Sequence, residues 1–131
     1  MGLFRKFDKG LAPLEESYSE SELSLLSKKG TIIDLAPGQT LFEEGTIGTE
    51  AAVIISGTAK VSHGGKTVAI LEAGNVIGES ALLSGSIRNA SVCSVTMLKI
   101  AVINKESMLT MLNECEDFRV RIDSALDSRA A

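Results

Sequence analysis

Histidine and cysteine are scarce in this chain of 131 residues. It has one histidine, His63, and two cysteines, Cys93 and Cys115. Protein metal sites take three or four ligands, most often histidine, cysteine or carboxylate, so a metalloenzyme built on clustered histidines is excluded. We expect no metal site and no catalytic residues. The cysteines lie in a strand pattern and a helix pattern, where small buried residues with reduced thiols are expected.

Long apolar runs and an excess of basic charge are also missing. No stretch of about 18 apolar residues is present, and no secretory signal pattern is found. The formal net charge is −4, and no basic stripe follows Lys66. Nucleic acid and anionic lipid both require a basic face, so neither is an expected partner. A cytoplasmic protein with no membrane span is the simplest interpretation.

The chain has no internal repeat and no low-complexity linker, so we expect one folded domain, residues 19–131, preceded by an N-terminal arm, residues 1–18. The first seven residues are mildly basic and amphipathic. A plain arm is favoured over a membrane or partner contact, because seven residues do not form a stable interfacial helix alone. Ser19 and Glu22 have the spacing of a capping box and predict a helix that ends at Gly30.

Short β-rich runs, separated by glycines, occupy residues 31–103. Many short strands with frequent turn signals predict a mainly β sandwich or jelly-roll barrel. Gly64 and Gly65 predict a two-residue hairpin turn, and His63 beside them is expected to be a solvated turn residue. The parity of the apolar residues changes near Met97, which predicts a bulge or turn there and two strands in place of one.

A stripe of apolar residues with helical spacing follows Asn104, which is a suitable helix N-cap. We therefore expect C-terminal helical structure that flanks the barrel. Two uses of the stripe stay open, since packing on the barrel and forming a homodimer both need one apolar face. Its members are Met108, Leu109, Leu112, Cys115, Phe118, Ile122 and Leu126.

The run from Gly78 to Leu83, together with Arg88, places an acid and a base close together in the chain. Gly78 lets the backbone approach a ligand, and the short helix-forming run after it directs free N–H groups to the same point, which suits an anion. Arg88 offers a planar, permanently charged fork that matches a phosphate. Glu79 accepts hydrogen bonds and needs a neutral donor, such as a ribose hydroxyl. A cyclic nucleotide carries both groups.

These residues resemble the phosphate-binding cassette of the cyclic nucleotide-binding domain family, which includes catabolite activator proteins, kinase regulatory subunits and nucleotide-gated channels. Upstream, residues 37–45 resemble the family's opening strand and turn, and residues 53–61 resemble its central strand pair. The resemblance runs from about Ser19 to Ala125. It implies a double-stranded β-helix, or jelly-roll, barrel flanked by an N-terminal helix and C-terminal helices.

The resemblance also implies a role for each matching residue. Glu79 accepts from the ribose 2′-hydroxyl, Arg88 pairs with the cyclic phosphate, and Gly78 permits the close approach. Asn89 stands where the family more often has a small or hydroxyl residue, and its amide could contact the phosphate or a purine amino group. A hydroxyl there is associated with guanine preference, so cyclic AMP is favoured over cyclic GMP. The phosphate cradle is completed by the backbone amides of Ser80, Ala81 and Ala90.

The purine base is expected against apolar walls, under a lid from the C-terminal helix at Phe118 and Arg121. The wall candidates are Ile77, Ile87, Val68 and Leu71.

No second apolar-periodic block that could form a helix-turn-helix is visible, and no kinase glycine loop. The expected function is therefore that of a regulatory module and not of an enzyme. It would signal through its C-terminal helix to an unidentified effector protein or to its own copy. The alternative is a degenerate domain that serves as a protein-interaction or dimerisation scaffold without ligand. The presence of both Glu79 and Arg88 argues against that alternative.

Overall fold

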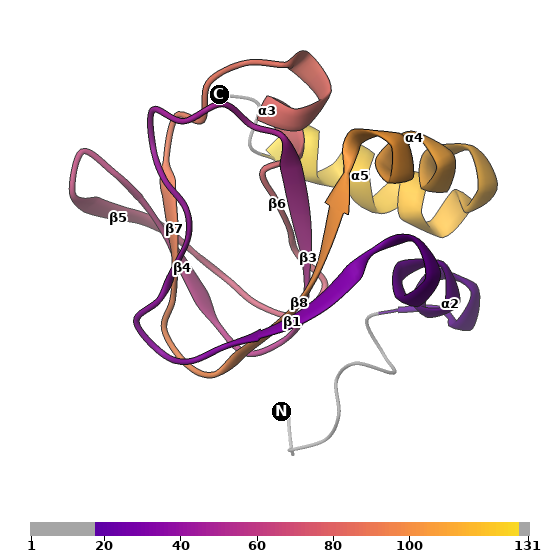
Figure 1. Ribbon diagram of the computed structural model, residues 1–131, viewed down its shortest axis with the longest axis horizontal. Helices are drawn as coiled ribbons and strands as arrows, with labels where there is room; N and C mark the ends of the chain where they lie inside the picture. Colours follow the sequence, from indigo (N-terminus) through magenta and orange to yellow (C-terminus); the bar gives the residue numbers. More distant parts are fainter. Residues whose placement is uncertain (1–17, 129–131) are drawn as a thin grey trace.

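The computed structural model describes residues 18–128, in which two β-sheets lie beside a layer of helices (Figure 1). The expected arm, residues 1–18, lies outside the described residues except for Tyr18, so the boundary at residue 19 stays a prediction. The helices are α2 (Glu20–Lys29), α3 (Glu79–Ser84), α4 (Lys105–Glu114) and α5 (Glu116–Ser128). The strands are β1 (Thr31–Leu35), β2 (Thr40–Phe42), β3 (Glu50–Ser56), β4 (Ala59–His63), β5 (Lys66–Leu71), β6 (Val76–Ile77), β7 (Ser91–Ser94) and β8 (Leu98–Asn104).

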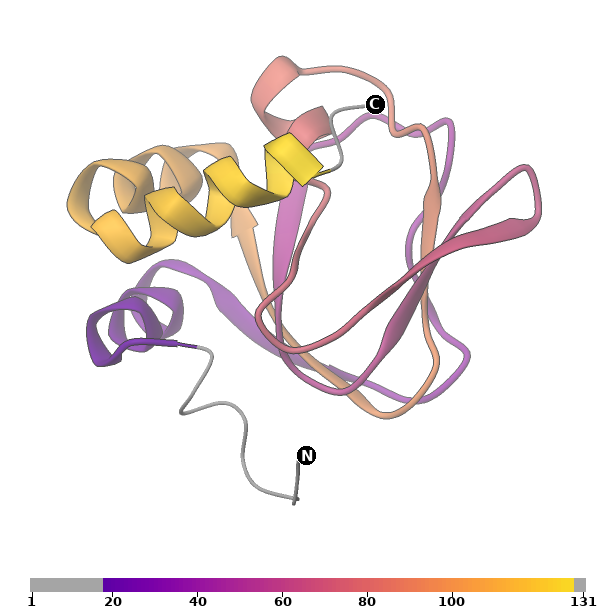
Figure 2. The ribbon, with the colours of Figure 1, turned by 180° about the vertical axis from the view of Figure 1, so that it is seen from behind.

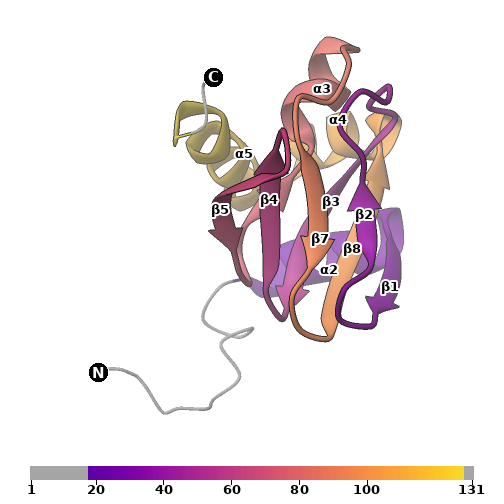
Figure 3. The same cartoon turned by 90° about the vertical axis from the view of Figure 1, so that its left-hand side faces the viewer.

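The strands form two antiparallel four-stranded sheets, with the orders β1-β8-β3-β6 and β2-β7-β4-β5. Strand β1 pairs with β8, β2 with β7, β3 with β6 and β4 with β5. This nested pairing is that of a jelly roll, so the expected mainly β fold is confirmed. The two sheets face each other (Figure 3) and are not joined into a closed barrel.

Strand β3 is buried on both faces, because helices cover one face and the second sheet covers the other (Figure 2). Its side chains alternate, so that Val53 joins the core under the helices and Ile54 joins the core between the sheets. The core under the helices also includes Leu26, Leu82, Ile103, Met108, Met111, Phe118 and Ile122. The core between the sheets also includes Phe42, Leu71, Ile77, Val92, Leu98 and Ile100.

Helix α2 begins and ends where the sequence predicts. The Ser19 hydroxyl accepts from the N–H of Glu22 at 3.2 Å, and Gly30 donates its N–H to the Leu26 carbonyl at 2.9 Å. The Glu22 side chain is fully buried, and its carboxylate accepts hydrogen bonds from Arg121 on α5. The acid in the capping pattern therefore serves a contact between two helices.

The predicted turns are confirmed. Gly64 and Gly65 have φ of 60° and 83° and connect β4 to β5 as a two-residue hairpin turn. The chain also leaves the sheet between β7 and β8, at residues 95–97, so two strands are present where the change of parity near Met97 predicts them.

The C-terminal stripe forms two helices, since α4 ends at Glu114 with Cys115 as its C-cap, and α5 begins at Glu116. Asn104 caps α4, and its side chain accepts from the N–H of Ser107 at 2.8 Å. One member of the predicted stripe is wrong. Leu109 is 49% exposed, and Met111 is buried instead, because Met108 and Met111 share the face that packs on the sheet.

Both cysteines are free thiols, with Cys115 buried and Cys93 half-buried. No helix within residues 18–128 has the length and apolar character that crossing a membrane requires. The stripe packs on the domain's own sheet, as one of its two expected uses requires, and its use in a dimer stays a prediction.

Candidate functional site

Helix α3 begins directly after strand β6, which is paired with the buried strand β3. Gly78 makes the connection in the left-handed conformation, with φ of 80°, and serves as the N-cap of α3. Gly85 ends the helix in the same conformation, with φ of 70°. Glycine adopts positive φ at no steric cost, so both turns follow from the residue type. The first turn of α3 is thereby held at the end of the sheet β1-β8-β3-β6.

The loop that follows α3 is bonded along its backbone to residues 45–48. Arg88 donates its N–H to the Thr46 carbonyl at 2.8 Å and accepts at its own carbonyl from Gly45 at 2.9 Å. The N–H of Gly48 donates to the Ser86 carbonyl at 3.2 Å. Because bonds are made on both sides of Arg88, the backbone carries its side chain back toward the start of α3.

All seven residues that the sequence predicts for the ligand site line one cavity of about 580 Å³. They come from the start of α3 and from the loop before β7, and the cavity lies between these and strands β4 and β5. The seven are Gly78, Glu79, Ser80, Ala81, Arg88, Asn89 and Ala90. The structure brings the predicted set together, while its role in binding stays a prediction.

Arg88 lies in a tightly packed position beside this cavity and is only 7% exposed. Its Nη2 donates to the Glu50 carbonyl at 2.5 Å, and its guanidinium lies 3.6 Å from the centre of the Phe42 ring. Burial lowers the pKa of Arg88, and the charge of Glu50 opposes that shift. A guanidinium keeps its charge in proteins, so Arg88 is a cation at neutral pH. A held cation of this kind suits an anionic ligand.

Glu79 occupies the first turn of α3 and is 3% exposed. A carboxylate near a helix N-terminus is favoured by the helix dipole, and a buried one is stabilised by hydrogen-bond donors. Arg88 and Glu79 thus place a cation and an acceptor on one cavity wall, next to the backbone of α3.

The predicted base walls and lid are only partly correct. Ile77 and Val68 line the cavity, but Leu71 lines a different cavity. Ile87 is exposed and forms an isolated bridge with Ile47. The lid candidates are wrong in the described state. Phe118 lies in the core under the helices, and Arg121 is paired with a buried acid.

Sequence reasoning missed five residues of the cavity lining. Val61 and His63 lie two apart on β4 and therefore share a face, and Val61 is the register partner of Val92 on β7. The sequence predicts the alternation of side chains along β4. It does not predict the register that places β4 beside β7, which is distant in the chain. The five missed residues are Phe42, Val61, His63, Ala69 and Val92.

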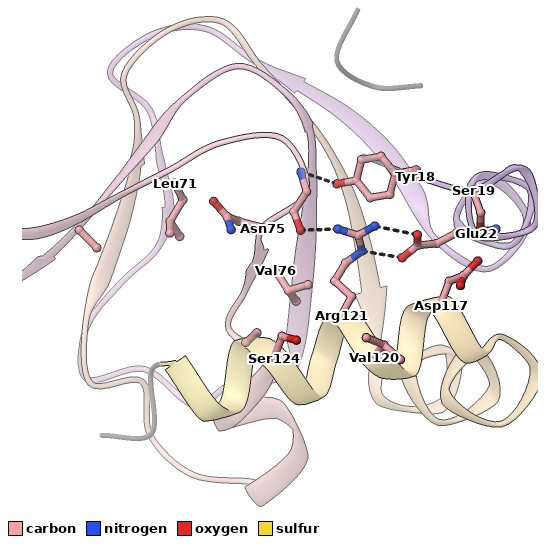
Figure 4. A pocket seen from close by; sticks show the side chains of 13 residues that line it. Tyr18, Ser19, Glu22, Leu71, Asn75, Val76, Asp117, Val120, Arg121 and Ser124 are labelled. Carbon is pink, nitrogen blue, oxygen red and sulfur yellow. Dashed lines mark hydrogen bonds and ion pairs between the residues drawn. The ribbon is translucent and has the colours of Figure 1, made fainter. Parts of the chain in front are cut away.

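A larger cavity, of about 810 Å³, lies between α5, the start of α2 and the turn before β6 (Figure 4). Arg121 lines this cavity from α5. Its Nε and Nη2 donate to the two carboxylate oxygens of Glu22 at 2.6 and 2.8 Å, and its Nη1 donates to the Gly74 carbonyl at 2.7 Å. All three guanidinium nitrogens thus donate hydrogen bonds that hold α5 to α2 and to the turn before β6. We call this arrangement of Arg121, Glu22 and Gly74 the clamp.

Two pKa shifts reflect this clamp. Burial lowers the pKa of Arg121, but the hydrogen bonds and the charge of Glu22 outweigh burial and raise it above its ordinary value. Burial raises the pKa of Tyr18 to about 12, against the opposing effect of the Gly74 N–H. The Tyr18 hydroxyl is therefore protonated at neutral pH. It donates to the Ile54 carbonyl and accepts from Gly74 at 2.9 Å.

Gly78 is expected to tolerate alanine less well than Gly85. Both glycines have positive φ, where alanine costs about 1–2 kcal/mol. A Cβ on Gly78 would also lie 2.5 Å from Arg88 Nη1 and 2.9 Å from the Phe42 ring, whereas Gly85 faces open space. Urea denaturation should therefore show a larger loss of unfolding free energy for Gly78→Ala than for Gly85→Ala. Equal losses would mean that the surroundings of Gly78 yield to a methyl group.

Comparison with known proteins identifies the family. Residues 32–115 match the cyclic nucleotide-binding domain family. The chain is 31% identical over 107 residues to a cAMP-dependent protein kinase regulatory subunit of Yarrowia lipolytica, covering 80% of this chain and 28% of that protein. It is 28% identical over 101 residues to a cGMP-dependent protein kinase of Toxoplasma gondii, covering 77% of this chain and 10% of that protein.

The fold comparison agrees. The catabolite activator protein of Thermus thermophilus superposes with a TM-score of 0.72 at 23% identity, covering 90% of this chain and 58% of that one. The chain belongs to the cyclic nucleotide-binding domain family, which confirms the resemblance, and the domains of this family are regulatory modules. It spans less than a third of the length of either kinase-related protein.

Proposed function

We propose that this chain binds a cyclic nucleotide in the cavity beside α3, with cyclic AMP preferred over cyclic GMP. The observation that carries the proposal is the convergence of Glu79, Arg88 and the start of α3 on one cavity. Arg88 would pair with the cyclic phosphate, and Glu79 would accept from the ribose 2′-hydroxyl. Gly78 would let the ligand approach the backbone. The amides of Ser80, Ala81 and Ala90 would complete the cradle.

The residues present fit such a ligand. A volume of about 580 Å³ lies within the range of roughly 300–1,000 Å³ that is typical of small-molecule sites. The cavity combines one buried cation, one buried acceptor and an apolar wall that includes Val61, Val68 and Ile77. A ligand with one anionic group, one hydroxyl group and one flat apolar part uses all three.

The preference for cyclic AMP depends on Asn89, which lines the cavity next to Arg88. A hydroxyl at this position would favour guanine in this family, and asparagine has none. The relatives include both a cAMP-dependent and a cGMP-dependent protein. The proposed preference for cyclic AMP therefore rests on Asn89 and not on the relatives.

Two contacts provide a route from the cavity to the C-terminal helix. Leu82 of α3 packs in the same core as Phe118 and Ile122 of α5. Arg121 of α5 bonds the carbonyl of Gly74, which precedes β6 and the cassette. A ligand that favours one position of α3 would thereby favour one position of α5. An effector protein or a second copy, in the cytoplasm, would detect that position.

Titration of the purified chain with cyclic AMP, cyclic GMP and linear 5′-AMP tests the proposal. We expect saturable heat with cyclic AMP, weaker binding of cyclic GMP and still weaker binding of 5′-AMP. At a free ligand concentration of about 100 times Kd, linkage adds about 2.7 kcal/mol to stability, so the thermal midpoint should rise with the same order of preference.

The absence of both heat and thermal stabilisation with either cyclic nucleotide would overturn the proposal and leave the protein-interaction scaffold as the better function. Tighter binding of cyclic GMP would overturn only the base preference.

A further inference from the structure

His63 is the last residue of strand β4 and lines the cavity of about 580 Å³ that contains the predicted ligand-site residues. It precedes the hairpin turn at Gly64 and Gly65, and its side chain is 64% exposed. The sequence pattern predicts a solvated turn residue at this position. The structure confirms that exposure, and the imidazole also lines the same cavity as Arg88 and Asn89.

The imidazole bonds to the loop that carries Arg88. Its Nδ1 lies 2.7 Å from the carbonyl oxygen of Asn89 and 3.2 Å from Oε2 of Glu44. A carbonyl and a carboxylate only accept, so Nδ1 carries the hydrogen and donates. The second oxygen of Glu44 accepts from the N–H of Gly64 at 3.1 Å. His63 and Glu44 thereby connect three segments: the β4–β5 hairpin, the loop after β2, and the loop of residues 85–90 between α3 and β7, which we call the cassette loop.

Holding the Asn89 carbonyl also orients the next N–H group. The carbonyl of Asn89 and the N–H of Ala90 belong to one planar peptide unit, in which a trans bond directs them to opposite sides. Fixing the carbonyl against His63 therefore fixes the direction of the Ala90 N–H. This N–H is one of the donors that the phosphate cradle needs.

The neighbouring units of the loop are held by other groups. The Arg88 backbone is bonded to Gly45 and Thr46. The Ser91 hydroxyl accepts from the N–H of Glu44 at 2.9 Å. Between these points, the contact of the Asn89–Ala90 peptide with another element comes from His63.

We propose that His63 is a positioning residue of the ligand site, which donates from Nδ1 to the Asn89 carbonyl and so directs the Ala90 N–H toward the anionic group of the ligand. This role rests on the proposed function, since it concerns the same cavity. His63 acts through the backbone of the cassette loop. Its loss should therefore weaken binding without unfolding the domain.

Three variants separate this role from a general effect of mutation. His63→Ala removes the donor. His63→Asn retains an N–H close to the position of Nδ1, because both branch from the same carbon of the side chain. Thr67→Ala changes an exposed residue on the other strand of the same hairpin and serves as the matched control. Each is titrated with cyclic AMP after its thermal midpoint has been compared with that of the wild type.

We expect His63→Ala to weaken cyclic AMP binding about three- to tenfold, as the loss of one hydrogen bond would. His63→Asn should bind within about twofold of the wild type, and Thr67→Ala should bind as the wild type does. Wild-type affinity in His63→Ala would overturn the role. Equal weakening in His63→Asn and His63→Ala would also overturn it, because the donor would then not matter.

A second readout is independent of any ligand. The Arg88 amide, which bonds to Thr46, should exchange its hydrogen faster in His63→Ala and at the wild-type rate in His63→Asn. If the wild type bound neither nucleotide, the proposed function would fail. Hydrogen exchange of the Arg88 amide would then be the only test of the contact between His63 and Asn89. Unchanged exchange in His63→Ala would then overturn the positioning role, and faster exchange that asparagine restores would support it.

Discussion

Replacement of Arg121 by alanine is expected to lower the free energy of unfolding by about 3–5 kcal/mol, a large part of the roughly 5–15 kcal/mol that stabilises a typical domain. Glu22 is fully buried, and both of its carboxylate oxygens accept from Arg121. Without the guanidinium, a charge stays buried without compensation. Urea denaturation followed by circular dichroism measures the loss.

Other substitutions should isolate the cause. Glu22→Ala is expected to cost less than Arg121→Ala, because the Arg121 side chain is 18% exposed and can turn toward water. Arg119→Ala removes the same charge from an exposed position on α5 and should change stability by less than about 0.5 kcal/mol. An apolar pair, Glu22→Leu with Arg121→Met, should recover much of the loss. Similar losses for Arg121→Ala and Arg119→Ala would contradict the buried-charge explanation.

The clamp also shows where sequence reasoning ends. Ser19 and Glu22 marked the start of α2 correctly, because capping depends on residues only three apart. The true partner of Glu22 is Arg121, which is 99 positions away in the chain. The family resemblance made Arg121 a candidate for the lid over the purine base. Its pairing across two helices depends on the tertiary packing, which no local pattern contains.

The fold was largely predictable because local sequence determines its turns and strand ends. The pair Gly64 and Gly65, both with positive φ, forms the β4–β5 hairpin turn, and the parity change near Met97 marks the break between β7 and β8. The helical stripe was less accurate. Leu109 fits the spacing but faces away from the sheet, since the break at Cys115 allows α4 and α5 to pack separately.

The cassette was predictable for a similar reason. Its seven predicted residues lie within residues 78–90 and are brought together by one short helix and one loop. The opposite wall of the cavity, formed by β4, β5 and β7, was not predictable. Which residues of these strands lie side by side depends on the register of the sheet, which no local pattern contains. His63 belongs to that wall, and its contact with Asn89 spans 26 positions. A lone histidine beside a glycine turn gives no sequence signal for such a contact.

Removal of the Arg88 guanidinium is expected to weaken cyclic AMP binding at least about 100-fold, because a buried charge pair would lose one partner. Arg88→Lys keeps the charge but loses the planar fork and the contact with the Phe42 ring, so a smaller loss of about tenfold is expected. Isothermal titration measures both. Lys66→Ala, which removes an equal charge from the exposed hairpin, should bind within about twofold of the wild type.

Arg88 also supports the fold, since Nη2 donates to the Glu50 carbonyl. Binding should therefore be compared only among variants that unfold cooperatively. Arg88→Gln keeps a polar side chain with N–H donors but no charge, and it replaces Arg88→Ala if the alanine variant fails to fold. Affinity within threefold of the wild type in either neutral variant would remove Arg88 from the site. A loss in Lys66→Ala as large as in Arg88→Ala would attribute the effect to overall charge. A loss confined to Arg88 would mean that the buried guanidinium, held by Glu50 and Phe42 before any ligand arrives, is what recognises the anion.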